Sequence, residues 1–423
     1  MRILYSLVIY VLQIPAAVYW AVRALTNHSY RPRIGQRFGM GYPRLEHCIW
    51  LHAVSVGEVQ AAAPLVRQLA RRFPNRPILL TTITPTGAAR VAALFGDSVT
   101  HCYIPFEMPI AVERFFSAVN PEIALVMETE IWPNLYHGCG VRGIPLVLVS
   151  ARISPRSVGA YRRLLPLFRE TLSHGIIIAA QSEADAERFR SLGASPEKTW
   201  VTGNIKFDVE IDPGLAERGR QLREQLFPQR RVWIAASTHE GEERPLLEAH
   251  ANLLDKYPDL LLVLVPRHPE RFDDVRALIE NAGFACVSRS DGQACQPETA
   301  VYLGDTMGEL TLFYAASDVA FVAGSLVPVG GHNVLEPAAL GLPFIIGRHY
   351  FNSEEIVEQF HQLGACRIVD DAAALAQAVA AFLDEPGEAA AMGRRGRDIL
   401  EQNRGALARL FTLLEPHVRD REG

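Results

Sequence analysis

Close cysteine and histidine pairs are missing from this 423-residue sequence. None of the six cysteines belongs to a CxxC pair, and the histidines form no HxxxH or HExxH pair. These absences argue against a disulfide framework and a zinc site, and they favour a reducing compartment. We therefore expect no metal and no cofactor, and we expect four isolated histidines to act only as polar lining: His52, His239, His268 and His332.

Three motifs of common enzyme classes are also missing. The chain has no GxSxG elbow, no Walker A lysine after a glycine turn, and no complete GxGxxG after its first strand-like run. These absences argue against an ordinary serine hydrolase, a P-loop ATPase and a classical dehydrogenase.

Acidic residues are absent from the first 45 positions, which contain six arginines. This end carries +6, so the overall charge of −5 leaves about −11 for the remainder. A basic start on an acidic protein favours anionic lipid over nucleic acid as a partner. We expect Arg31, Arg33 and Arg37 to meet anionic head groups or the phosphates of an acceptor, and we place Arg152 with them as an acceptor-facing cation.

The segment Ile3–Val22 is apolar apart from three residues and is long enough to span a bilayer. It ends in the interfacial pair Tyr19-Trp20, with Arg23 following, which predicts a membrane anchor over residues 1–25 and a cytoplasmic domain after it. Gln13 and Pro15 leave open a helix that lies in the interface instead of crossing. A helix buried in a protein core is the remaining alternative.

The rest of the chain alternates short apolar runs with helical segments. This pattern predicts an α/β protein with two doubly wound, Rossmann-like domains facing a cleft. We place the first domain at 26–208, a polar linker at 209–230 and the second domain at 231–423. The expected strands are Cys48–Val54, Ile78–Thr82, Val99–Ile104, Ile123–Met127, Leu146–Ser150, Ile176–Ala180, Val232–Ala236, Leu260–Val265, Cys286–Ser288, Ala300–Leu303, Val319–Ala323, Phe344–Gly347 and Arg367–Val369.

Functional groups of parallel sheets collect just past the strand ends, and two glutamates stand there in the first half. Glu58 follows the first strand and is the candidate general base, although a glutamate in a first helical turn also complements the helix dipole. Glu128 directly follows five apolar residues, so it either faces a polar cleft or forms a salt bridge with Arg152 or Lys206.

Two cations are suited to an anion. Lys206, at the domain junction, and Arg267, in the second half, follow strand ends and either neutralise a carboxylate or phosphate, or serve structure alone. The turn at Gly330-Gly331 lets the backbone approach a ligand, and Asn333 is expected to cap the following helix, whose start suits a phosphate. Glu336, one turn in, either accepts hydrogen bonds from a ribose diol or complements the helix dipole.

Five ordered motifs together resemble the 3-deoxy-D-manno-octulosonic acid (Kdo) transferases that modify lipid A in Gram-negative bacteria. The resemblance covers nearly the whole chain, and the sequence departs from the family pattern at none of these positions. The motifs are His52–Glu58 (HAVSVGE), Met127–Asn134 (METEIWPN), Gly203–Asp208 (GNIKFD), Pro266–Phe272 (PRHPERF) and Gly330–Pro337 (GGHNVLEP).

The resemblance implies a GT-B glycosyltransferase that moves Kdo from CMP-Kdo to a lipid A precursor, without a metal, on the cytoplasmic face of the inner membrane. It places the proton acceptor at Glu58 and transition-state support at Glu128 and Lys206. The donor-binding positions it implies are Pro266, Arg267, Met307, Gly308, Glu309, Gly330, Gly331, Asn333, Val334, Leu335 and Glu336.

Two other functions stay open from the residues alone. A sugar-nucleotide epimerase of GT-B fold would share the donor site but has no need of the apolar N-terminal segment. A non-catalytic, membrane-bound lipid-binding protein would need that segment but not Glu58 or a nucleotide site. The sequence predicts neither the number of Kdo residues transferred nor the oligomeric state.

Overall fold

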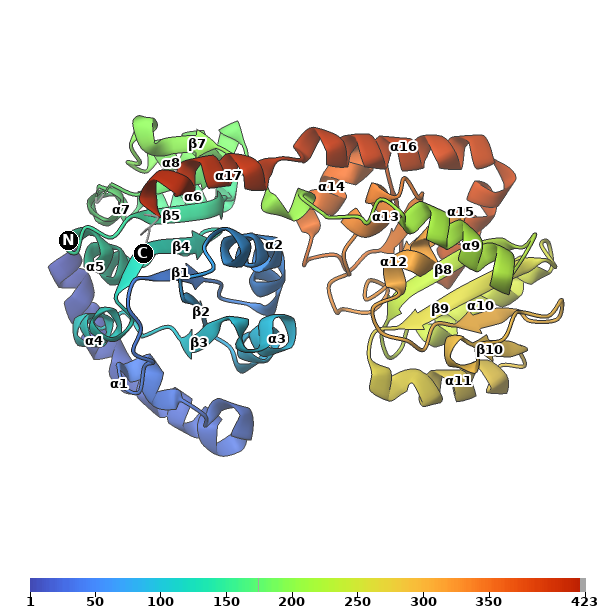
Figure 1. The fold of residues 1–423 in the computed structure, drawn as a ribbon, viewed down its shortest axis with the longest axis horizontal. Helices are drawn as coiled ribbons and strands as arrows, with labels where there is room; N and C mark the ends of the chain where they lie inside the picture. The colour runs from blue at the N-terminus through green and yellow to red at the C-terminus, as the bar shows by residue number, and fades with distance from the viewer. Residues whose placement is uncertain (174, 419–423) are drawn as a thin grey trace. The chain divides into compact units, whose positions relative to one another are not determined.

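The computed structural model describes residues 1–173 and 175–418, which form two compact α/β units (Figure 1). The first unit contains Met1–Asp208 and the end of the chain from Asn403. The second unit contains Val209–Gln402. Each unit is built on a seven-stranded parallel sheet, so the α/β, GT-B-like fold expected from the alternating pattern is confirmed.

The first sheet has the strand order β3-β2-β1-β4-β5-β6-β7. The order reverses between β1 and β4, which is the topological switch point where ligands bind in open α/β sheets. The short strand β7 was not expected from the sequence. The strands are β1 Cys48–His52, β2 Ile78–Thr82, β3 Thr100–Tyr103, β4 Pro121–Met127, β5 Leu146–Ala151, β6 Ile177–Ala180 and β7 Thr199–Val201.

Helices cover both faces of this sheet. The α-helices are α1 Arg2–Thr26, α2 Val56–Arg72, α3 Pro85–Phe95, α4 Pro109–Val119, α5 Pro133–Val141, α6 Pro155–Arg162, α7 Leu165–Leu172, α8 Glu183–Ser191 and α17 Ala406–Leu414. The 3-10 helices are η1 His28–Tyr30, η2 Ile34–Phe38, η3 Gly96–Ser98, η4 Pro196–Lys198, η5 Ile205–Phe207 and η8 Glu415–His417.

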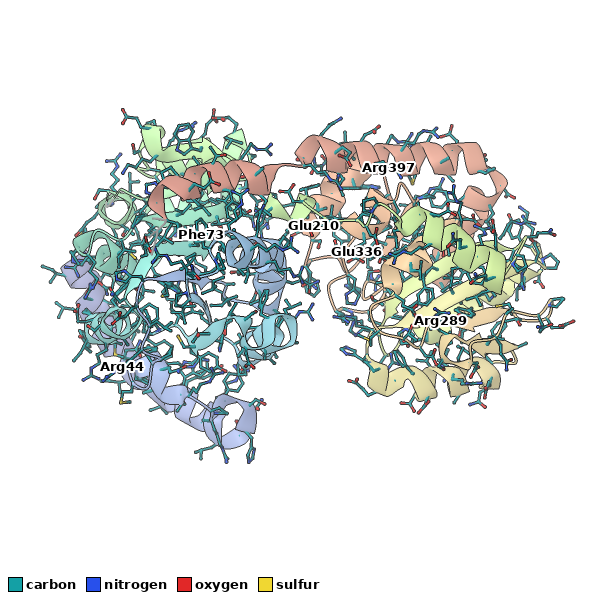
Figure 2. The ribbon with its side chains drawn as sticks, viewed as in Figure 1. Arg44, Phe73, Glu210, Arg289, Glu336 and Arg397 are labelled. Atoms are coloured by element: carbon teal, nitrogen blue, oxygen red, sulfur yellow. The ribbon has the colours of Figure 1, made fainter. Side chains whose placement is uncertain are left out.

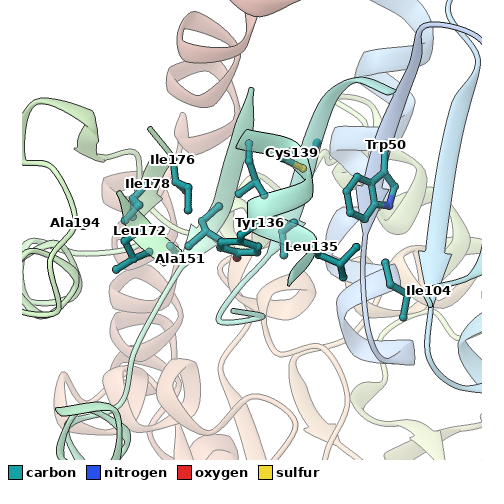
Figure 3. Close-up of a cluster of buried hydrophobic side chains, with 14 of the residues drawn as sticks. Trp50, Ile104, Leu135, Tyr136, Cys139, Ala151, Leu172, Ile176, Ile178 and Ala194 are labelled. Carbon is teal, nitrogen blue, oxygen red and sulfur yellow. The ribbon is translucent and has the colours of Figure 1, made fainter. Parts of the chain in front are cut away.

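Successive residues of a strand point to opposite faces, so the first unit has two hydrophobic clusters. Ile49 of β1 and Phe73, which follows α2, belong to one cluster together with α17 (Figure 2). Trp50 belongs to the other cluster, with Tyr136 of α5 (Figure 3). Burial on both faces explains why these strands are continuous apolar runs.

The second sheet has the order β10-β11-β9-β8-β12-β13-β14 and its switch point lies between β8 and β12. Its strands are β8 Arg231–Thr238, β9 Leu260–Pro266, β10 Cys286–Ser288, β11 Val301–Leu303, β12 Val319–Val322, β13 Phe344–Gly347 and β14 Arg367–Val369. The helices are α9 Leu215–Leu226, α10 Glu243–Leu254, α11 Phe272–Asn281, α12 Leu310–Ala315, α13 Leu335–Ala339, α14 Glu354–Gln362, α15 Ala372–Asp384 and α16 Pro386–Asn403, with 3-10 turns η6 Pro269–Arg271 and η7 Arg289–Asp291.

Two predicted domain boundaries are wrong. The expected linker 209–230 contains α9, which packs so closely on α12 that a Cβ on Gly219 would lie 2.5 Å from the Cβ of Ala315. The segment therefore belongs to the second unit, because its polar face masked a helix with buried leucines. The end of the chain belongs to the first unit, since Leu410 and Phe411 of α17 are buried in its core.

The expected apolar N-terminal helix is present as α1. Within the described ranges it is the one helix that is long and apolar enough to cross a membrane, by length and composition. Only 6% of its most apolar window is buried, so the alternative of a helix inside a protein core is excluded.

Candidate active site

Glu58 lies in the first turn of α2, directly after β1 at the switch point of the first sheet. Ser55 caps this helix, and its hydroxyl oxygen accepts a hydrogen bond from the Glu58 N–H at 3.4 Å. The Glu58 carboxylate in turn accepts a hydrogen bond from the Val54 N–H at 2.8 Å. These two bonds hold the half-buried carboxylate over the strand end, much as in a capping box.

Glu128 follows β4, the neighbour of β1, in a left-handed backbone conformation with φ of 53°. Its carboxylate accepts hydrogen bonds from the Lys206 ammonium at 2.9 Å and from the Arg152 guanidinium at 3.1 Å. The Glu128 side chain is only 13% exposed. The expected salt bridge of Glu128 is therefore present, and it involves both cations instead of one.

These contacts give the two carboxyl groups different pKa values. Burial, aided by repulsion from Glu128 and Glu130, raises the pKa of Glu58 to about 7, against the opposing effects of the Val54 N–H and Lys206. Burial alone would also raise the pKa of Glu128, but Lys206 and Arg152 outweigh it and lower that pKa. Near neutral pH Glu58 can therefore accept a proton while Glu128 stays ionised.

A third carboxyl group, Glu130, lies two residues after Glu128 at this strand end. It accepts a hydrogen bond from the indole N–H of Trp132 at 2.9 Å, and burial raises its pKa. Trp132 precedes α5, so this bond ties the loop after β4 to the helix that follows it. Three carboxyl groups and two cations thus meet at one edge of the first sheet.

The arginines expected to face the acceptor or the membrane have different surroundings. Arg37 is only 2% exposed, so its predicted contact with a lipid or an acceptor is wrong. Its guanidinium donates to the Ile83 carbonyl and lies over the rings of Trp20 and Tyr103, because a planar cation stacks well on aromatic faces. Arg152 is 37% exposed and is held by Glu128.

Arg31 and Arg33 are exposed, as expected. Arg31 donates to the carbonyls of Ala24 and Leu25 and so caps the end of α1. Arg33 donates to the carbonyl of His101 at 2.9 Å.

In the second unit, the glycine turn is shaped by its own packing. Gly330 and Gly331 both have positive φ, and both of their N–H groups donate to the carbonyl of Gly324. A Cβ on Gly330 would lie 2.4 Å from the side-chain nitrogen of Asn352. The glycines are therefore required for the turn itself, whereas the sequence suggested close approach to a ligand.

The helix after this turn, α13, begins at Leu335 with Val334 as its N-cap, so Asn333 is not the cap expected. The Asn333 side chain still accepts a hydrogen bond from the Leu335 N–H at 3.1 Å and donates to the Glu336 carboxylate at 3.1 Å. Burial raises the pKa of Glu336, while Asn333 and the charge of Arg267 oppose the rise. Figure 2 shows Glu336 within the second unit.

Arg267 follows Pro266, the last residue of β9, and its N–H donates to the carbonyl of Thr238 at the end of β8. Its positive charge also contributes to lowering the pKa values of His239 and His332. These interactions place the predicted cation within electrostatic range of both histidines and of Glu336.

The prediction that the histidines are isolated is wrong for three of them. The Nε2 atoms of His239 and His332 lie 2.9 Å apart, and the His268 ring packs edge-on against His239. They come from the ends of β8, β9 and β12, which are neighbours in the sheet. Burial, then the nearby positive groups, lower the pKa of His332 to about 3, and burial also lowers the pKa of His239, so one neutral ring donates its Nε2–H to the Nε2 of the other. No group of three His, Cys, Asp or Glu side chains suited to a metal ion occurs in 1–173 or 175–418.

Glu242 is a residue that sequence reasoning missed. This fully buried carboxylate accepts hydrogen bonds from four backbone N–H groups, those of His239, Gly324, Ser325 and Leu326, at 2.7 to 3.0 Å. It holds the start of the 324–334 loop, which carries the glycine turn. The one sequence signal is the acidic pair Glu242-Glu243 after a strand, which is equally typical of an ordinary helix start.

The segment Met307-Gly308-Glu309 lies in the loop before α12. Glu309 forms two hydrogen bonds with the Arg289 guanidinium, at 2.9 and 3.0 Å, and a third with the Thr306 hydroxyl. Hydrogen bonding from Arg289 lowers its pKa. Met307 is exposed and Gly308 has φ of 86°, so the side chain of Glu309 organises the loop while its neighbours face solvent.

Comparisons with known proteins cover both units. Residues 32–209 match the family described as 3-Deoxy-D-manno-octulosonic-acid transferase (kdotransferase), and residues 229–399 match Glycosyl transferases group 1. The chain is 42% identical to a 3-deoxy-D-manno-octulosonic acid transferase of Haemophilus influenzae over 99% of both chains. It is 37% identical to one of Bordetella pertussis, covering 87% of this chain and 86% of the relative.

Among solved structures, UDP-GlcNAc 2-epimerase from Neisseria meningitidis bound to UDP-GlcNAc has a TM-score of 0.53 at 16% identity, covering 87% of this chain and 99% of the epimerase. At this identity the likeness concerns the fold alone.

The raised pKa of Glu58 predicts a pH-dependent effect on stability. Folding favours the protonated carboxyl, so ionised Glu58 opposes folding increasingly as pH rises from its ordinary pKa of 4.5 to about 7. Glu58→Gln should therefore stabilise the first unit more at pH 8 than at pH 5, by roughly 1–3 kcal/mol. Hydrogen exchange of β1 and α2 amides measures this difference. Glu187→Gln on the exposed side of α8 is the control, and equal effects at both pH values would contradict the prediction.

Proposed function

Because the chain belongs to the 3-deoxy-D-manno-octulosonic acid (Kdo) transferase family and is a glycosyltransferase, we propose that it transfers Kdo from CMP-Kdo to a lipid A precursor, lipid IVA. We place the reaction in lipopolysaccharide synthesis at the cytoplasmic face of the inner membrane, with α1 as the membrane-attachment element. The observation that carries the proposal is a glutamate with a pKa of about 7 at the first switch point, beside an ionised Glu128.

In this reaction Glu58 removes the proton of an acceptor hydroxyl. The acceptor oxygen then forms a bond with the anomeric carbon of Kdo, and the bond from that carbon to the phosphate oxygen breaks as CMP leaves. A base with a pKa near the working pH is present in the ionised form often enough to act, and it still binds the proton well. Ionised Glu128 supports positive charge that develops on the sugar as the donor bond weakens.

Lys206 and Arg152 keep Glu128 ionised, and Lys206 also lowers the pKa of Glu58. Both cations therefore prevent the three carboxyl groups at this edge from being protonated together. Lys206 thus acts through the two glutamates, which is the support role that the resemblance implied.

The second unit supplies groups suited to the CMP portion of the donor. Arg267 brings a positive charge beside Glu336, and the backbone around Asn333 is the start of a short helix. In CMP the ribose diol lies next to the phosphate. A cation that binds the phosphate, with a carboxylate beside it that accepts hydrogen bonds from the ribose hydroxyls, therefore matches this part of the donor. Val334 and Leu335 are buried, so only their backbone groups can meet a nucleotide.

The two alternatives have less support. Likeness to a sugar-nucleotide epimerase is confined to the fold at 16% identity, whereas identity to a Kdo transferase is 42% along the whole chain. A non-catalytic lipid-binding protein does not account for the raised pKa of Glu58 beside a fixed, ionised carboxylate.

Glu58→Gln should reduce the rate of Kdo transfer by about 10²–10⁴ while CMP affinity stays within twofold. In the wild type, kcat/KM should rise with pH and level off above about 7, since the base must be ionised before it accepts a proton. Product formation from CMP-Kdo and lipid IVA measures both effects. Turnover near the wild-type rate in the variant would remove Glu58 from the mechanism, with Glu187→Gln as the matched control.

Arg267→Ala and Glu336→Ala should each weaken CMP binding by about 1–3 kcal/mol, since each loses a charge-assisted contact. Titration calorimetry with CMP tests this, with Arg276→Ala on α11 as the control because that arginine pairs with Glu280 and Asp291 on the unit's surface. Unchanged affinity in both variants would place the nucleotide elsewhere.

We also propose that transfer requires no metal ion, since Arg267 offers positive charge where the donor phosphate is expected. The rate should then be the same with and without excess EDTA. A loss of activity that Mg²⁺ restores would contradict this part of the proposal.

A further inference from the structure

Helix α1 directs several polar side chains toward the protein and most of its large aliphatic side chains toward the outside. Figure 1 shows it running beside α4 and α5 of the first unit. Ser6 is buried and Gln13 is half-buried on the inner side. This is the reverse of a helix on the surface of a water-soluble protein, whose apolar stripe faces the core.

Polar contacts fasten the beginning of α1. The N-terminal ammonium lies 3.1 Å from the Glu170 carboxylate of α7, which also accepts a hydrogen bond from the Arg2 N–H. One turn later, the Ser6 hydroxyl donates to the side-chain oxygen of Asn134 in α5 at 3.0 Å.

A buried carboxylate lies beneath this part of the helix. Glu107 is 2% exposed and accepts hydrogen bonds from the N–H groups of Asn134 and Leu135 at 2.7 and 2.9 Å. It is also hydrogen-bonded to the hydroxyl of Tyr5 on the inner side of α1. Moving α1 away would break this set of bonds and expose a buried polar cluster to its new surroundings.

Aromatic contacts fasten the other end. The ring of Trp20 packs against Phe106 with centroids 5.9 Å apart, and the Arg37 guanidinium lies 4.2 Å from the Trp20 centroid. Contacts therefore run from residue 1 to residue 20. Trp20, expected from sequence at the membrane interface, faces the protein, while its neighbour Tyr19 is exposed.

The outer side of α1 is a continuous apolar surface. Ten aliphatic side chains there are each at least 48% exposed: Ile3, Leu4, Leu7, Val8, Val11, Leu12, Ile14, Val18, Val22 and Leu25. Ile110, at the start of α4, is 50% exposed as well. Soluble monomers rarely leave a surface of this extent in water, so it marks a site of association.

The charges beside this surface favour a lipid bilayer over another protein. Arg23, Arg31 and Arg33 are exposed at the end of α1, and no acidic residue occurs before Glu46. Exposed arginines next to an apolar helix face match anionic head groups above acyl chains.

Length does not decide whether α1 crosses this bilayer. A helix of 25 residues is about 38 Å long, and the hydrocarbon core is about 30 Å thick. The contacts decide it, because a crossing helix docked in this way would take Glu107, Asn134 and Arg2 into hydrocarbon. A helix that crossed after detaching would lose every contact with Glu170, Asn134 and Phe106.

We propose that α1 lies in the plane of the cytoplasmic membrane interface, docked on the first unit by its polar side, with its apolar side in the acyl-chain region. This inference extends the proposed function. It rests on that function for the assignment of α1 to the cytoplasmic face of the inner membrane. The Arg37 carbonyl accepts from the Phe106 N–H, and its side chain donates to Ile83, so the end of α1 is tied to the carboxyl edge of β2 and β3. Glu58 lies at that same edge, where a lipid head group at the interface can present its hydroxyl.

The first test locates residue 2, in a chain whose two incompletely buried cysteines, Cys286 and Cys295, are replaced by serine. In native membranes, Arg2→Cys should react with an impermeant maleimide in inside-out vesicles and not in right-side-out vesicles. Arg2→Cys with Glu170→Cys should be joined by a short bis-maleimide, with the single variants as controls. Labelling from the periplasmic side without cross-linking would show a crossing helix and overturn the proposal, while Kdo transfer by the same membranes would still support the proposed function.

The second test concerns the apolar side. Leu7→Gln, Val11→Gln and Ile14→Gln together alter only exposed side chains, so the protein should fold normally. Binding to vesicles containing phosphatidylglycerol should fall at least tenfold, whereas Leu363→Gln, 53% exposed in the second unit, should have no effect. Transfer to a detergent-dispersed acceptor should be unchanged. Vesicle binding equal to the wild type would assign this surface to another partner and overturn the proposal, and absence of transfer in the wild type would overturn the proposed function instead.

Discussion

The carboxylate of Glu128 lies between the Lys206 ammonium and the Arg152 guanidinium, and the properties of the first unit's site depend on this arrangement. Three carboxyl groups share one sheet edge, and burial acts to raise the pKa of each of them. Two cations directed at one carboxylate keep that group ionised. Its charge, together with burial, then raises the pKa of Glu58. Glu58 therefore owes part of its raised pKa to a neighbour that stays ionised.

A buried carboxylate also organises the second unit, in a different way. Glu242 is held by four backbone N–H groups. Because those N–H groups belong to the ends of β8 and β12, the carboxylate fixes the two loops on either side of the switch point. The glycine turn and Asn333 follow one of these loops, so the positions suited to a nucleotide depend on a residue that need not touch it.

The sequence predicted the fold well because buried parallel strands are continuous apolar runs separated by helices. It located Glu128 because that residue directly follows such a run, and Glu58 because it lies in the first turn of the helix after one. It missed the contact of His239, His268 and His332, which are far apart in sequence and meet only because β9, β8 and β12 are adjacent in the sheet. Glu242 was missed because its partners are backbone N–H groups, which almost every residue type has, so the sequence does not identify them. The 209–230 helix was missed because polar residues hide a narrow stripe of buried leucines.

The inner side of α1 shows how one pattern can support two different structures. In a sequence, a polar residue within an apolar helix argues against a membrane-spanning segment. In α1, however, Ser6 and Tyr5 form hydrogen bonds with polar side chains of α5 and of the loop before α4. In the proposed arrangement, a helix docked in this way would hold the first unit at a fixed orientation to the membrane surface, whereas a flexible anchor would not. Since α1, the arginines after it and Glu58 all belong to the first unit, the proposal gives Glu58 a constant depth relative to lipid head groups. Groups suited to the nucleotide lie in the second unit, so donor affinity and base strength can change independently.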